Sequence, residues 1–320
     1  NQFIASFILY LRSNISGLHL FKTDSILSVL DRFLMIIICG ILLWGGITNS
    51  PFKIEWFVYA QTLAYSITLL ISVLIVINTS GFFKLNFDRV YFLAILKKSY
   101  PFALLSLLMA LYYRIDSVMI ERMLPDGKEQ AGIYAQGFRI LDAASMFSFL
   151  FAALLLPMFS RMIKNRQPVV SLVQFSFLLL IVPAIGLVFA SYFYKLQIID
   201  ILYHHHVSYA ADIFGILIFC FIGISSSYIF GTLLTANGNL KYLNILSAGG
   251  ALLNIVLNII LIPRYYAWGA AMASLFTQTI IAAIQILMVK KVFHFHISFS
   301  KILTLALFIL AVWIISRYSV

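Results

Sequence analysis

The sequence predicts an all-α fold, a polytopic bundle of about ten transmembrane helices. Two observations carry this prediction. The composition is 62% hydrophobic and only 10% charged, with a mean hydropathy of +1.01. The apolar residues also fall in long runs that short polar turns separate, and about 20 mainly apolar residues suffice to cross roughly 30 Å of hydrocarbon. A soluble 320-residue domain with this surface is excluded.

The pattern places ten helical spans in order along the chain. They are expected at residues 1–20, 24–47, 54–78, 92–123, 129–162, 168–193, 208–236, 240–262, 267–290 and 299–318. The first is the weakest, because Arg12 and Asn14 interrupt its apolar run. The connections TNSP, NTSG, PDG and ANGN carry turn residues, and none is long enough for a separate soluble domain.

The basic residues predict the orientation of these spans. Of the 22 Lys and Arg residues, 14 lie in one alternating set of loops and 6 in the other. Because cytoplasmic loops carry the excess of Lys and Arg, the richer side is expected in the cytoplasm. Asn1 is then outside, and an odd number of spans is expected upstream of it if the complete protein begins in the cytoplasm.

Several functional classes lack a signature in this sequence. The net charge of +11 comes from loops that set orientation, so no nucleic-acid partner is expected. No P-loop, HExxH or GxSxG motif occurs, and neither an enzyme nor a cofactor is predicted. Cys39 and Cys220 lie in apolar segments and are expected to be small buried residues. His204, His205 and His206 are consecutive, so their side chains diverge and no metal site is predicted.

Two consecutive spans carry charged residues near mid-membrane. Arg114 and Asp116 lie on one span, Arg139 and Asp142 on the next, and the polar turn PDGKEQ joins them. Ionisable residues at that depth face a bundle interior or a water-filled cavity. Arg114 lies twelve residues before Asp126 and Arg139 thirteen after it, so the two arginines are expected at similar depth in a helical hairpin. Two guanidinium groups at one level suggest a site for an anion.

Two interpretations of these four residues remain open. In the first they form a structural network, Asp116 with Arg139 and Asp142 with Arg114. In the second at least one arginine binds an anionic head group, for which its planar fork of donors is suited. Both hold if a substrate phosphate displaces a carboxylate. Elsewhere, Asn254, Asn258 and Gln278 are expected to form hydrogen bonds between helices.

The residues around this hairpin resemble a known family of transporters. The run YYRIDSVMIERMLPDGKEQAGIYAQGFRILDAASMFSFLFAALLLPMFSRMI resembles the seventh and eighth helices of the polysaccharide-biosynthesis flippases, within the multidrug/oligosaccharidyl-lipid/polysaccharide exporter superfamily. FGTLLTANGNLKYLNILSAGGALLNIVLNIILIPRYYAWGAAMASLFTQ is similar to the tenth to twelfth helices, and NQFIASFILYLRSNISGLHLFKTDSILSVLDR to the fourth and fifth. The family often has Gly where Tyr266 stands.

The resemblance implies two six-helix bundles around a cavity that opens alternately to each side of the cytoplasmic (inner) membrane. Residues 1–90 would form the second half of the first bundle, 91–291 the complete second bundle and 292–320 one additional helix. About three helices are then expected before Asn1 and one after Val320. The implied substrate is a lipid-linked oligosaccharide, as in O-antigen and lipopolysaccharide biosynthesis. Membrane lipids and polysaccharide-assembly proteins are the other implied partners.

Within this family, cationic cavity residues take the pyrophosphate of an undecaprenyl-linked sugar. By position only Arg114 and Arg139 match that role, with Asp116 and Asp142 beside them. The alternative is a drug or cation exporter of the same superfamily, for which exposed carboxylates rather than arginines are expected. A membrane scaffold without transport activity is a third class. The sign of the charge in the cavity discriminates the first two.

Overall fold

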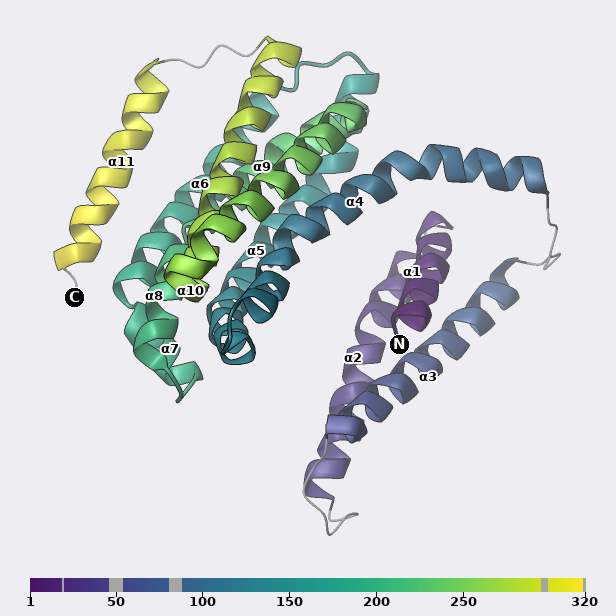
Figure 1. Ribbon diagram of the computed structural model, residues 1–320. Coiled ribbons are helices and arrows are strands. Elements are labelled where there is room, and N and C mark those ends of the chain that lie inside the picture. The colour runs from purple at the N-terminus through teal and green to yellow at the C-terminus, as the bar shows by residue number, and fades with distance from the viewer. Residues whose placement is uncertain (19, 46–53, 81–87, 295–298, 319–320) are drawn as a thin grey trace. The chain divides into compact units, whose positions relative to one another are not determined.

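The computed structural model describes all residues except 19, 46–53, 81–87, 295–298 and 319–320 (Figure 1). All secondary structure in the described part is helical, which confirms the all-α prediction. The helices are α1 Gln2–Gly17, α2 Phe21–Trp44, α3 Ile54–Ser80, α4 Arg89–Met123, α5 Gly127–Lys164, α6 Val170–Phe193, α7 Lys195–Leu202, α8 Val207–Leu217, α9 Cys220–Ala236, α10 Leu240–Phe293 and α11 Phe299–Tyr318.

The helices are long and apolar enough for a multi-pass membrane protein. Among the described residues, seven helical segments reach spanning length and hydropathy. One of them is the 54-residue α10, which is long enough to cross about 30 Å twice. Another joins α8 and α9 into a single span, Val207–Ala236. Lys53 and Lys84, two of the residues behind the predicted orientation, lie outside the described residues.

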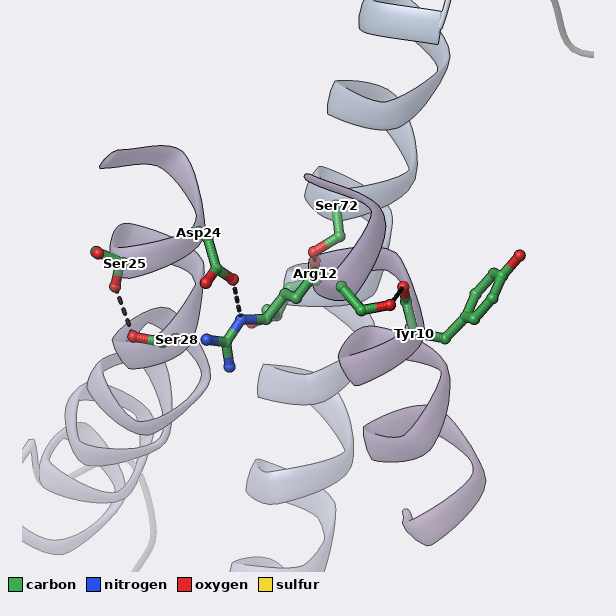
Figure 2. A network of polar contacts seen from close by, with 8 residues as sticks. Tyr10, Arg12, Asp24, Ser25, Ser28 and Ser72 are labelled. Carbon is green, nitrogen blue, oxygen red and sulfur yellow. Dashed lines mark hydrogen bonds and ion pairs between the residues drawn. The ribbon is translucent and has the colours of Figure 1, made fainter. Parts of the chain in front are cut away.

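The chain divides into two compact units, Asn1–Arg89 and Val90–Val320. In the first unit, α1, α2 and α3 pack against one another. Arg12 on α1 forms an ion pair with Asp24 in the first turn of α2, with 2.7 Å between Nε and Oδ1 (Figure 2). This pair explains why a charge is accommodated in the interrupted first span. The buried hydroxyls of Thr68 and Ser72 on α3 donate to carbonyls one turn earlier on the same helix.

The second unit has two large clusters of buried apolar side chains. One cluster joins α4, α5, α8 and the middle of α10, with Tyr134 and Phe214 fully buried in it. The other joins the far end of α5 to α6, α9 and both ends of α10, with Phe159 and Val289 fully buried. Small residues allow close approach in the first cluster: a Cβ on Gly137 of α5 would lie 3.0 Å from the Cα of Phe214 on α8.

The span predicted at 208–236 is interrupted. Ile218 and Phe219 separate α8 from α9, and the amide of Phe219 donates to the carbonyl of Ile216, a three-residue step. A short 3₁₀-type turn therefore joins the two helices. The preceding short helix α7 was not predicted, because eight residues are too few to give a clear helical period.

The two spans predicted at 240–262 and 267–290 form one interrupted helix. Tyr266 lies inside α10 with φ 55° and ψ −139°, a backbone conformation far from the helical one. Pro263, three residues earlier, has no amide hydrogen to donate to the helix. A Cβ on Gly269 would lie 2.7 Å from the carbonyl carbon of Leu261, so the two halves of α10 approach closely at this kink.

Candidate functional site

Of the four charged residues near mid-membrane on α4 and α5, Arg114 and Asp142 form an ion pair. Nη2 of Arg114 on α4 lies 2.8 Å from Oδ2 of Asp142 on α5. The pair is accessible, since the Arg114 side chain is 65% exposed and that of Asp142 46% exposed. The Arg114 guanidinium also lies over the ring of Phe138, 5.1 Å from its centroid. Phe138 and Asp142 are four residues apart on α5 and therefore share a face, which brings both to the same arginine.

This ion pair lines a cavity of about 230 Å³. Its walls come from α4, α5 and α9: Ala110, Tyr113, Arg114, Phe138, Leu141, Asp142, Ser145, Ile224 and Tyr228. Three of these side chains are aromatic. The site therefore combines a cation, a carboxylate and aromatic rings in one small hollow within the second unit.

Arg139 lies on the exposed side of α5, one turn before Asp142. It has no hydrogen bond or ion pair within the described residues, and it is not among the residues that line the cavity. Met146 and Phe147 are exposed farther along α5. Arg139 is thus a cation without a protein counter-charge in the part of the chain that the structure describes.

Asp116 has an entirely different environment. It is 0% exposed and accepts three hydrogen bonds from neutral side chains. Its donors are Tyr134 on α5 at 2.9 Å, Asn258 on α10 at 2.6 Å, and Ser274, also on α10. Asn258 and Ser274 lie on opposite sides of the α10 kink, so this single carboxyl group joins both halves of α10 to α4 and α5.

The predicted network is therefore half right. The pairing of Arg114 with Asp142 is confirmed. The pairing of Asp116 with Arg139 is wrong. Asp116 follows Arg114 by two residues, about 200° around the helix, so the two cannot share a face. Asp116 points toward α10, whereas Arg139 is exposed.

The sequence pattern did not predict several residues that surround the Arg114–Asp142 pair or the buried Asp116. Phe138 and Ser145 could have been found, because they lie four and three residues from Asp142 on one helix. Tyr228 and Ser274 lie in later helices, where no local signal marks them. Asn258 was predicted to make an interhelical hydrogen bond, and its bond to Asp116 confirms this.

The remaining candidate residues lie elsewhere. Nε2 of His206 lies 3.1 Å from Oε1 of Glu129 at the start of α5, and both side chains are exposed. Cys39 is half-buried and Cys220 buried, and both are free thiols. Among the described residues, no group of three or more His, Cys, Asp and Glu side chains is arranged to hold a metal ion.

Two solved structures share this arrangement of helices. An outward-facing multidrug resistance MATE family transporter of the MOP superfamily aligns with a TM-score of 0.66 at 12% identity, over 85% of this chain and 62% of that one. The lipid II flippase MurJ in an inward closed conformation aligns with a TM-score of 0.60 at 16% identity, over 97% of this chain and 70% of that one. At such low identity the similarity establishes the fold. The chain spans 62% of the length of the first of these structures.

The sequence comparison with protein families is more specific. No curated protein matches the sequence. Residues 2–163 match the family described as "Polysaccharide biosynthesis protein". The match begins in α1 and ends in the last turn of α5, so it contains Arg114, Asp116, Arg139 and Asp142. It covers half of the chain, and the protein therefore belongs to the polysaccharide biosynthesis protein family.

Proposed function

We propose that the complete protein flips a lipid-linked oligosaccharide, a polyprenyl-pyrophosphate glycan, across the cytoplasmic membrane for polysaccharide biosynthesis. The observation that carries this proposal is the accessible Arg114–Asp142 pair in an aromatic-lined cavity. Membership of the polysaccharide biosynthesis family supports the same substrate class.

The charges of the site favour an anionic group. Asp142 neutralises Arg114 in this state, whereas Arg139, one turn away, has no counter-charge within the described residues. An incoming pyrophosphate would compete with Asp142 for the guanidinium of Arg114 and bring Arg139 into the same interaction. Arginine suits this role because its fork of donors binds phosphate oxygens in pairs.

The aromatic residues suit the sugar next to the pyrophosphate. Tyr113, Phe138 and Tyr228 line the cavity beside Arg114. The C–H face of a pyranose ring stacks on aromatic rings, and the Asp142 carboxylate can accept hydrogen bonds from sugar hydroxyls. The cavity, about 230 Å³, is smaller than the roughly 300–1,000 Å³ of pockets for drug-sized ligands. It is therefore suited to the pyrophosphate and first sugar rather than the whole glycan.

The alternative is a drug or cation exporter of the same superfamily. A cation site calls for an accessible, unpaired carboxylate. On α4 and α5, Asp142 is already paired with Arg114 and Asp116 is buried and fully hydrogen-bonded. These contacts disfavour a cationic drug at this site.

The test measures protein abundance and flipping together in a flippase-deficient strain that carries the complete gene. Replacing Arg114 and Arg139 together by Ala should reduce flipping by more than about tenfold at normal abundance, because two charge-assisted contacts are lost. Replacing each by Lys should impair flipping less, since Lys keeps the charge but loses the fork. Arg122→Ala is the matched control, because Arg122 is exposed on α4 outside the cavity. Normal flipping in a well-expressed double variant would contradict the proposal.

A further inference from the structure

A second basic site lies at the C-terminal end of α5, far from the PDGKEQ turn that precedes this helix. Three cations follow one another where α5 ends, Arg161, Lys164 and Arg166, and all are exposed. Lys290 and Lys291 lie in the last turn of α10. The two helix ends are adjacent, because Phe293 of α10 lines a cavity together with Ile163, Arg166, Gln167, Pro168, Val169 and Val170.

No carboxylate of the second unit is available to these cations. The sequence has no Asp or Glu between Asp142 and Asp200, and none after Asp212. None of the five cations forms an ion pair among the described residues. Among the described residues, the charged side chains of the last turn of α5, the start of α6 and the last turn of α10 are therefore all positive. The start of α6 adds to it, since no side chain caps the free amides there.

Arg166 has a backbone conformation that favours glycine. Its φ is 54°, its amide donates to the carbonyl of Ile163, and the amide of Gln167 donates to that of Met162. These two bonds are the Schellman motif, in which Gly usually takes the left-handed position. The same two bonds end α9, and there the left-handed residue is Gly238, with φ 79°.

The turns that end α5 and α9 have the same hydrogen bonds and differ in the left-handed residue, which is Arg166 in one and Gly238 in the other. Both turns lie at the same end of the unit, since Val169 after α5 and Leu234 on α9 belong to one buried cluster. A non-glycine residue is strained in the left-handed region, and such outliers persist where the surroundings or a function require them. The orientation of the protein in the membrane depends on basic residues in this loop, but it does not require one at the left-handed position.

We propose that this basic site binds the head group of an anionic phospholipid in the leaflet that faces the cytoplasm. Arg166, Lys164 and Lys290 contact the phosphate, since Lys290 lies three residues before Phe293 and shares its helix face. The apolar walls formed by Ile163, Val170 and Phe293 take the first part of an acyl chain. Juxtamembrane basic pockets between helices bind anionic lipids in this way, and the charge distribution of the loops assigns this end to the cytoplasm.

The test compares lipid binding by variants of the purified chain in a neutral detergent. Intact-protein mass spectrometry would measure the apparent affinity for dioleoyl-phosphatidylglycerol, with dioleoyl-phosphatidylcholine as the neutral reference. Arg166→Gly should bind phosphatidylglycerol about fivefold more weakly, the loss expected for one charge at a lipid surface. Its melting temperature without lipid should be unchanged or higher, because glycine relieves the strained turn.

Two further variants make the result decisive. Arg166→Gly combined with Lys164→Gln and Lys290→Gln should lose more than about 100-fold in affinity for phosphatidylglycerol, from three charges. Arg122→Gln removes one exposed cation at the other end of the unit and should leave the affinity unchanged. An unchanged preference for phosphatidylglycerol in the triple variant, or an equal loss in Arg122→Gln, would overturn the proposal. Because the readout is lipid binding, it is independent of the glycan-flipping proposal.

Discussion

Asp116 and Asp142 lie on neighbouring helices of one hairpin, and their surroundings differ sharply. Asp142 is 46% exposed and bound to a single cation, Arg114. Asp116 is 0% exposed and bound to three neutral donors from two other helices. An exposed ion pair contributes little to stability, whereas a buried polar group leaves costly unsatisfied partners when it is removed. Asp116 is therefore expected to maintain the fold, whereas the Arg114–Asp142 pair can be broken at little cost in stability, as the proposed anion binding requires.

The strongest test of this contrast is the replacement of Asp116 by Ala. The side chains of Tyr134, Asn258 and Ser274 would each lose a buried partner. We expect a loss of at least about 3 kcal/mol in the free energy of unfolding, from three groups at about 1–3 kcal/mol each. Thermal unfolding of the purified protein and its abundance in the membrane would measure this loss. Ser117→Ala is the control, since Ser117 is the next residue on α4 and is only half-buried. A stable Asp116→Ala protein would contradict the structural role.

A second test addresses the kink that the Asp116 cluster spans. Tyr266 has φ 55° and is 47% exposed, so glycine would relieve backbone strain at little loss of burial. We expect Tyr266→Gly to raise the free energy of unfolding by about 1 kcal/mol. The neighbouring change Tyr265→Gly should lower it by about as much, because Tyr265 has helical backbone angles. A destabilised Tyr266→Gly protein would show that the Tyr266 side chain outweighs the strain.

The exposed ion pair should respond more weakly in stability. We expect Arg114→Ala to change the free energy of unfolding by less than about 1 kcal/mol, the range found for ion pairs between exposed side chains. Unfolding measured beside Asp116→Ala under identical conditions checks this. Equal losses in the two variants would mean that the Arg114–Asp142 pair also maintains the fold, and the proposed binding role would then lose its basis.

The smallest effect is expected at the histidines. Among the described residues, the one side-chain interaction removed by replacing His204, His205 and His206 with Ala is the exposed contact between His206 and Glu129. Transport by the complete protein should therefore remain nearly unchanged. A loss of more than about tenfold, about 1.4 kcal/mol, that added zinc restores would instead indicate a metal site.

The sequence determined most of what depends on neighbouring residues. Hydropathy and run length identified the helical spans, because the thickness of the hydrocarbon sets the length of each apolar run. The Arg114–Asp142 pair could also be predicted from the sequence, because a short turn joins the two helices and therefore places them side by side. Even the interruption of α10 at Tyr266 falls in the predicted gap between two spans.

Only the tertiary structure decided which residues complete the two clusters. Asn258 and Ser274 lie 142 and 158 positions from Asp116, and Tyr228 reaches the Arg114 cavity from α9. The helical period of about 3.6 residues predicts that Asp116 and Arg114 lie on different faces of α4. It does not predict which residues each of them contacts, because that depends on how α10 and α9 pack against the hairpin. The fates of the two carboxyl groups therefore follow from packing between distant helices, which no local pattern of residues encodes.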